Sequence, residues 1–151
     1  MNQIITIGRE FGSGGRELGR RLSEALGIAY YDQEIVSEIA KRTDLSEQYV
    51  REVEEHHSIF SYPIHIGQTF SVQPNLMLEQ RAKIYAEQSR IIEEMASKSD
   101  CVIVGRCADV VLADFKPFRI FVYADLASKM ARCREKVPGE RHLSDRELRQ
   151  K

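Results

Sequence analysis

The segment GREFGSGGRELGRR near the N-terminus combines several glycines with arginines, directly after an apolar run at residues 4–7. The apolar run is typical of a buried strand, and residues 16–26 show a helical pattern that Gly27 would end. A strand that passes through glycines into a helix gathers backbone N–H groups at the positive end of the helix dipole, where phosphate binds well. Three glycines would let the backbone approach an anion without a Cβ clash, namely Gly12, Gly14 and Gly15.

This turn matches neither of the two common phosphate-loop patterns in full. The Walker pattern G-x-x-x-x-G-K-[ST] requires a lysine, which the turn lacks. The dinucleotide fingerprint G-x-G-x-x-G fits Gly12 and Gly14 but meets Glu17 at its third glycine, while Asp32 lies about 20 residues downstream, as that motif requires. A phosphate site, a dinucleotide site and a plain bend remain open on the local pattern. Phosphate binding is favoured, because Arg16 would add a charged, bidentate donor at the start of the helix.

Strands and helices that would position this turn alternate along the chain. Apolar runs predict strands at residues 4–7, 28–31, 101–104 and 118–123. Helical patterns begin at residue 16, after Asp32, within residues 44–47, at residue 75 and after Asp125. Between them, residues 56–75 have no sustained period and predict an irregular loop. The alternation of strands and helices predicts an α/β fold with a parallel sheet.

Two local details of these helices can be compared with a structure. The first helix is expected to carry an apolar face that includes Leu18, Leu22 and Leu26. The sequence D-L-S-E at residues 44–47 resembles a capping box, with Asp44 as the residue that caps the helix.

Composition limits the classes of protein to which the chain can belong. Its 151 residues suffice for one domain, and 42% hydrophobic with 30% charged residues is typical of a globular protein. The 22 basic residues balance 23 acidic ones, so a generally basic nucleic-acid surface is not indicated. Neither an apolar run that could span a bilayer nor a signal peptide is evident. The 3 cysteines lack C-x-x-C spacing and are expected to be reduced thiols in a cytoplasmic protein. The sequence leaves the oligomeric state open.

Two separated motifs together resemble a known family. The stretch IITIGREFGSGGRELGRRLSEALGIAYYDQEIV, followed by CVIVGRCADVVL and an arginine-bearing helix, resembles the cytidylate kinase-like family of P-loop nucleoside monophosphate kinases. The resemblance implies a three-layer α/β/α P-loop NTPase fold with a parallel sheet, in a single domain over residues 1–151. It also implies an acceptor-side insertion at about residues 56–75 and a lid region at about 134–151, cut short by the end of the chain. The implied reaction transfers the γ-phosphoryl of ATP to CMP or dCMP with Mg²⁺, so the expected partners are small-molecule nucleotides.

The resemblance also implies roles on the side of the phosphoryl donor. The expected cradle for the ATP phosphates consists of Gly12, Ser13, Gly14 and Gly15, with Glu17 beside it. Arg16 is expected to do the charge-neutralising work of the absent lysine, and Arg132 to act on the donor phosphates from the helix before the lid. Arg134 on the same helix is a further expected phosphate ligand. Arg16, Arg106 and Arg132 are the expected catalytic residues.

On the acceptor side, the resemblance implies a second group of residues. Arg106, at the carboxyl end of the strand at 101–104, corresponds to the Gly-Arg element that lies near the acceptor. Asp32 corresponds to an acidic position at the mouth of that site, and Asp109 is a further candidate. The resemblance assigns no residue to the metal ion, and Glu17 and Asp109 are the candidate carboxylates that could hold it.

The chain departs from the family pattern at the loop. Gly15, Arg16 and Glu17 stand where such kinases carry lysine, a small residue and threonine, so the usual hydroxyl ligand of Mg²⁺ is missing. This departure keeps two alternatives open: a nucleotide-binding module without catalysis, and a dinucleotide-binding oxidoreductase domain.

Overall fold

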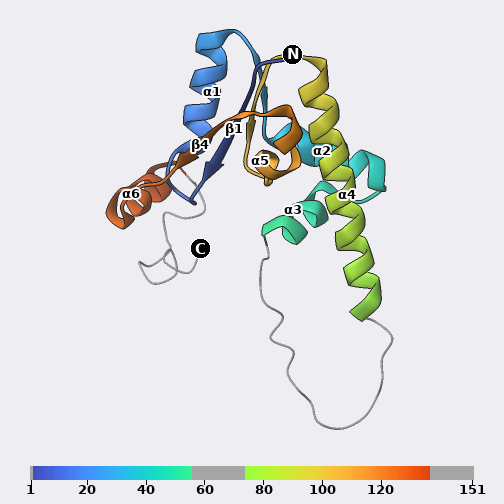
Figure 1. The fold of residues 1–151 in the computed structure, drawn as a ribbon. Coiled ribbons are helices and arrows are strands. Elements are labelled where there is room, and N and C mark those ends of the chain that lie inside the picture. Colours follow the sequence, from blue (N-terminus) through green and yellow to red (C-terminus); the bar gives the residue numbers. More distant parts are fainter. Residues whose placement is uncertain (1, 56–73, 137–151) are drawn as a thin grey trace. The chain divides into compact units, whose positions relative to one another are not determined.

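The computed structural model describes residues 2–55 and 74–136 of the chain (Figure 1). They divide into two compact units, one formed by residues up to 32 together with those from 92 onward, and the other by residues 33–91. Most of the predicted irregular segment and of the predicted lid lies outside the described residues. All strands belong to the first unit, so the candidate phosphate loop can be followed there by itself.

The described strands form a single parallel sheet. They are β1 (Ile4–Arg9), β2 (Ala29–Tyr31), β3 (Cys101–Val104) and β4 (Phe118–Val122). Their spatial order is β2-β3-β1-β4, and every neighbouring pair is parallel. The prediction of an α/β fold with a parallel sheet is therefore confirmed. The order also separates β1 from β2 by β3, whereas the dinucleotide-binding fold places β2 directly beside β1.

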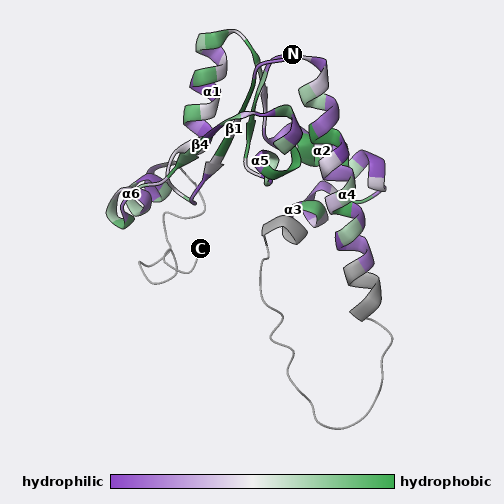
Figure 2. Ribbon diagram, in the orientation of Figure 1, coloured by the Kyte–Doolittle hydropathy of each residue, from purple (hydrophilic) through white to green (hydrophobic). Residues whose placement is uncertain are grey.

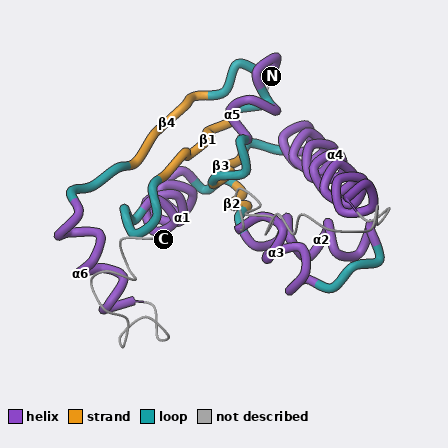
Figure 3. Tube along the Cα trace, turned by 90° about the horizontal axis from the view of Figure 1, so that it is seen from below, coloured by secondary structure: helices purple, strands orange, loops and turns teal. Residues whose placement is uncertain are grey.

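Both faces of the sheet are covered, which explains why its central strands are largely apolar. Figure 3 shows α1 (Gly15–Leu26) on one face of the sheet and the short α5 (Ala108–Val111) on the other. The side chains of β1 and β3 that form the core toward α1 are Ile5, Ile7, Val102 and Val104. The alternate residues Ile4, Thr6 and Ile103 are also buried, as expected for a sheet between two helical layers. Figure 2 shows these strands as largely hydrophobic.

Helix α1 packs on the sheet mainly through small residues, and of the three leucines predicted on its apolar face only Leu22 lies against the core of β1 and β3. Its buried residues are Gly15, Gly19 and Ser23, whereas Leu18 and Leu26 are exposed. A Cβ added to Gly19 would lie 2.7 Å from a methyl group of Val104. The helix axis therefore lies so close to the sheet that large side chains are directed to its flanks.

The second unit contains α2 (Gln33–Thr43), α3 (Glu47–Glu55) and the larger part of α4 (Pro74–Lys98). Its buried residues include Ile35, Val36, Ile39 and Ala40 on α2, and Ile84 and Ile91 on α4. The hydroxyl of Tyr49 on α3 donates to the side-chain oxygen of Gln80 on α4 at 2.7 Å. Among the described residues, no helix combines the length and the apolar character that crossing a bilayer requires.

Helix ends follow the predicted signals in two of three cases. Gly27 adopts a left-handed conformation with φ 65° after α1. Asp125 accepts a hydrogen bond from the backbone N–H of Ser128 at 2.9 Å and so caps α6 (Leu126–Lys136). The predicted cap at Asp44 was wrong, because Asp44 itself takes a left-handed conformation with φ 57°. Ser46 caps α3 instead, accepting from the N–H of Tyr49 at 3.2 Å.

Candidate functional site

The register of the sheet brings the ends of three strands to one edge. Ile7 of β1 lies opposite Val104 of β3, and Tyr31 of β2 lies opposite Ile103. The segments that follow these strands therefore leave the sheet side by side, and the N–H of Gly105 donates to the carbonyl of Ile7 at 2.8 Å. Ligands of parallel α/β sheets bind at this carboxyl edge, so the predicted residues at positions 12–17, 32, 106 and 109 gather where a site is expected.

The glycine-rich loop between β1 and α1 is a tight, internally bonded turn. Gly12 and Gly14 have φ values of 74° and 91°, a conformation that favours glycine. Both the N–H and the hydroxyl of Ser13 donate to the carbonyl of Glu10, at 3.2 and 2.8 Å. Because Gly14 has no side chain, it cannot cap the first-turn N–H groups of α1, which have no acceptor within the helix. These N–H groups can serve an anion.

Helix α6 lies against this loop. Lys129 pairs with Glu10 at 2.9 Å, and its hydrogen bond to Glu10 lowers the pKa of that carboxyl. The Arg132 guanidinium lies over Gly14, where an added Cβ would be 2.9 Å from its central carbon, and Arg132 pairs with Glu17 at 3.3 Å. Of the two arginines predicted on this helix, the structure therefore brings Arg132 to the loop, whereas Arg134 is exposed.

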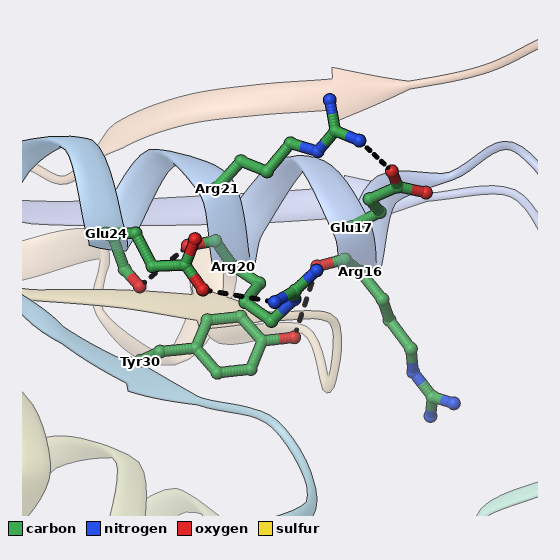
Figure 4. Close-up of polar contacts among 7 residues, drawn as sticks. Arg16, Glu17, Arg20, Arg21, Glu24 and Tyr30 are labelled. Carbon is green, nitrogen blue, oxygen red and sulfur yellow. Dashed lines mark hydrogen bonds and ion pairs between the residues drawn. The ribbon is translucent and has the colours of Figure 1, made fainter.

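Arg16 contacts the acidic residue at the end of β2. Its Nε lies 2.9 Å from a carboxylate oxygen of Asp32, which is buried, whereas the Arg16 side chain is 56% exposed. The hydroxyl of Tyr30 donates to the Arg16 carbonyl at 3.3 Å and ties β2 to the first turn of α1. Figure 4 shows the Arg16 side chain running away from those of Arg20 and Arg21 on the same helix. The residues predicted for the donor and the acceptor sides are thus joined in one ion pair.

Arg9, the last residue of β1, is a site residue that the sequence did not reveal. A Cβ added to Gly15 would lie 2.6 Å from the Cβ of Arg9, and one added to Gly105 would lie 2.5 Å from its Nη1. The stem of Arg9 thus passes Gly15, and its guanidinium lies against Gly105. Burial, followed by the charge of Arg16, lowers the pKa of Arg9; Arg106 lowers it further, and Asp32 opposes these effects. The only signal for Arg9 in the sequence is a cation directly before the glycine-rich loop.

The turn after β3 is left-handed at three consecutive residues. Gly105, Arg106 and Cys107 have φ values of 74°, 59° and 51°. Residues other than glycine adopt this conformation at a cost of roughly 1 to 2 kcal/mol each, and such strain often accompanies functional sites. The turn places the half-buried Arg106 within electrostatic reach of Arg9.

Two carboxylates that were predicted as metal ligands do not form a preformed metal site. Glu17 pairs with both Arg21 and Arg132, and Asp109 lies in the first turn of α5. Over the side chains that the structure describes, no group of three or more histidine, cysteine, aspartate or glutamate residues is placed to hold a metal ion. The metal-binding and catalytic roles of individual residues therefore stay predictions.

The gathered charges suit a polyphosphate. Five cations lie at the loop or beside it, namely Arg9, Arg16, Arg106, Lys129 and Arg132. They surround the carboxylates of Glu10, Glu17 and Asp32. Together with the N–H groups of α1, these positive charges can neutralise the phosphates of a nucleotide and the charge that spreads over them during transfer.

Comparisons with solved structures agree with this geometry. An uncharacterized protein from Eubacterium ventriosum is similar, with a TM-score of 0.62 and 26% identity over 99% of this chain and 68% of that one. Shikimate kinases from Bacteroides thetaiotaomicron and Acinetobacter baumannii share the fold, with TM-scores of 0.57 and 0.52. Their identities are 15% over 97% of this chain and 73% of that one, and 16% over 99% and 73%, respectively.

Comparison at the level of sequence gives the family. No curated protein matches the chain. The model of the cytidylate kinase-like family matches residues 4–151, which include both the glycine-rich loop and the turn after β3. The described residues form the parallel α/β sheet of P-loop kinases, and the loop stands at its carboxyl edge. The chain belongs to the cytidylate kinase-like family.

Proposed function

We propose that the protein transfers the γ-phosphoryl group of ATP to a nucleoside monophosphate, with CMP or dCMP as the first acceptors to test. An acceptor phosphate oxygen attacks the γ-phosphorus, the bond to the β-phosphate oxygen breaks, and ADP and a nucleoside diphosphate leave. The protein contributes positioning and charge stabilisation to such a transfer. Membership of the cytidylate kinase-like family supports this class of reaction.

The observation that carries the proposal is the set of arginines around the loop. Arg132 lies over Gly14 of the glycine-rich loop. Arg16 and Arg106 follow β1 and β3, and Asp32 follows β2. In this proposal Arg132 and the loop hold the donor, Arg106 and Asp32 orient the acceptor, and Arg16 lies between the two.

Mg²⁺ accompanies ATP in most such reactions and would screen the phosphate charges. Magnesium sites in kinases use one or two carboxylates together with substrate phosphates and water. Glu17, which stands at the position of the usual hydroxyl ligand, is held by Arg21 and Arg132 instead. The described residues therefore do not fit a preformed magnesium site, and no step of the proposal depends on one.

The lack of a preformed magnesium site among the described residues favours one alternative, a nucleotide-binding module without catalysis. ADP formation can be followed with ATP, Mg²⁺ and a panel of CMP, dCMP, UMP, AMP, GMP and shikimate; shikimate is included because one structural neighbour was solved in complex with it. The proposal predicts turnover with at least one nucleoside monophosphate and its loss in Arg106→Ala. ATP binding without turnover of any acceptor would support the binding module instead.

A further inference from the structure

Position 15 is where a phosphate-loop lysine would stand, and the structure gives a reason for the glycine. A Cβ at Gly15 would lie 2.6 Å from the Cβ of Arg9 and 3.1 Å from its Cγ. Real Cβ atoms essentially never approach other atoms to within 3.0 Å, and the Cβ of Arg9 cannot swing away because it is bonded to the backbone of β1. A side chain at position 15 and the present side chain of Arg9 therefore exclude each other.

The head of Arg9 lies between the two turns at the edge of the sheet. Its Nη1 is 2.5 Å from the point where a Cβ on Gly105 would be. Among residues 2–55 and 74–136, the side chain of Arg9 forms no ion pair and no hydrogen bond, whereas Arg16, Lys129 and Arg132 each pair with a carboxylate. Since arginine stays protonated in proteins, Arg9 presents a charged, two-pronged donor beside the loop.

The surroundings of Arg9 make a bound anion favourable. Arg16 and Arg106 repel its charge, and part of its surface is buried, so its pKa is lowered. Like charges brought together cost free energy unless something offsets them. A polyphosphate on the loop would offset this repulsion.

We propose that Arg9, reaching from the end of β1, binds the polyphosphate of the nucleotide in place of the missing loop lysine. The inference rests on the proposed function only in taking a polyphosphate as the ligand. It differs from the role expected for Arg16, whose Nε is engaged by Asp32 and whose side chain is more than half exposed. In a standard phosphate loop the cation is a lysine at the position of Gly15, at the start of the helix. Here Arg9, at the end of β1, would supply the cation instead, and position 15 is a glycine.

Binding of inorganic tripolyphosphate and of ATP to the full chain, measured by calorimetry, tests this exchange. Arg9→Ala is expected to weaken binding of both by roughly ten- to a hundredfold, the range for a charged hydrogen bond. Arg16→Ala should weaken binding less than Arg9→Ala does. Arg20→Ala is the matched control, since Arg20 is an exposed arginine on α1 that pairs with Glu24, and its affinity should equal that of the unmutated chain.

A stricter test restores the lysine at position 15 and removes the arginine at position 9. Gly15→Lys alone should lower the melting temperature and weaken binding, because the new side chain meets Arg9. The double variant Arg9→Gly with Gly15→Lys should recover tripolyphosphate affinity to within about threefold of the unmutated chain, since it removes the Cβ at position 9 and restores the loop lysine. If circular dichroism shows that the double variant is unfolded, Arg9→Lys decides, and it should bind tripolyphosphate more tightly than Arg9→Ala.

The outcomes separate this inference from the proposed function. Binding that depends on Arg9 in a chain that phosphorylates no acceptor would leave the inference standing and remove the kinase proposal. Turnover with unchanged tripolyphosphate affinity in Arg9→Ala would do the opposite. A folded double variant without recovered affinity, an Arg9→Lys variant no better than Arg9→Ala, or an unmutated chain that binds no tripolyphosphate would overturn the inference.

Discussion

Two turns follow neighbouring strands at the same edge of the sheet, and they are built differently. The turn after β1 uses glycine at both of its left-handed positions, Gly12 and Gly14, and leads into the 12-residue helix α1. The turn after β3 uses one glycine and then Arg106 and Cys107 in the same conformation, and leads into the 4-residue α5. The first turn avoids backbone strain, whereas the second retains it and keeps a charged side chain.

The difference shows that the glycines serve two purposes. Gly12, Gly14 and Gly105 are required by a positive φ, but Gly15 is not in that conformation. Gly15 is required because Arg9 fills the space beside it, and the head of Arg9 reaches Gly105. The side chain of Arg9 therefore contacts both turns, and a substitution at either turn should alter the position of this side chain.

The largest expected effect is a difference in reactivity among the three cysteines, which lie in or near the two turns. Cys107 is exposed in the second turn, Cys133 is buried against Gly12 of the first, and burial raises the pKa of Cys101, on β3, to about 11 from 9.0. Because the thiolate is the reactive form, the two-unit shift alone predicts that Cys101 reacts about a hundredfold more slowly at pH 8 than a thiol with the ordinary pKa of 9.0. Mass spectrometry after timed alkylation measures these rates.

The same shift predicts a direction for stability. The unfolded thiol of Cys101 ionises near pH 9.0, so the contribution of its burial is intact below that pH and is lost as pH rises toward 11. Labelling of Cys133 as fast as that of Cys107 would contradict the close contact between α6 and the first turn.

Gly15→Ala should have the next largest effect. The added methyl group meets the Cβ of Arg9 at 2.6 Å and should destabilise the fold by about 1 to 3 kcal/mol in urea unfolding. Gly27→Ala is the matched control, because nothing lies within 4 Å of its added Cβ and only its φ of 65° is unfavourable. Adding Arg9→Gly removes the contacting Cβ and should relieve much of the cost at Gly15 and none at Gly27. Equal costs with and without Arg9 would show that Arg9 does not crowd position 15.

Arg132→Ala tests the contact of α6 with the first turn. Removing the guanidinium over Gly14 should weaken ATP binding by about tenfold, which corresponds to about 1.4 kcal/mol. Arg134→Ala removes an exposed arginine from the same helix and should change the affinity by less than twofold. The affinities of the two variants would be compared by ATP titration. A similar loss of ATP affinity in both would show that general surface charge, and not the contact of Arg132 with the loop, is responsible.

Cys107→Gly should have the smallest effect and the opposite sign. Glycine adopts a φ of 51° without the cost that cysteine bears, so the free energy of unfolding should rise by about 0.5 to 1 kcal/mol. The second turn would then resemble the first. A loss of stability on urea unfolding would mean that the cysteine side chain, and not the backbone, stabilises this turn.

Local patterns predicted most of the fold but missed the residue that joins the turns. The strand predicted at 101–104 agrees with β3, because its apolar run is buried on both faces. The first strand was predicted to end at Ile7, where its apolar run stops, but β1 continues to Arg9, which lies opposite Val122 of β4. That pairing is between residues far apart in the sequence, so no local pattern could place Arg9 on the sheet.

The candidate site shows the same division. Asp32 and Arg106 could be placed from the strands that precede them. The ion pair between Arg16 and Asp32 and the approach of Arg132 to Gly14 depend on how α1 and α6 lie against the sheet. Packing of this kind is set by non-local contacts, which a single sequence does not contain.

A crystal structure of the chain with a non-hydrolysable ATP analogue would test the central claim most directly. The account predicts that a guanidinium nitrogen of Arg9 lies about 3 Å from an oxygen of the β- or γ-phosphate, with Gly15 beneath it. An analogue bound on the loop with Arg9 still turned toward Gly105, and with Arg16 alone contacting the phosphates, would contradict it.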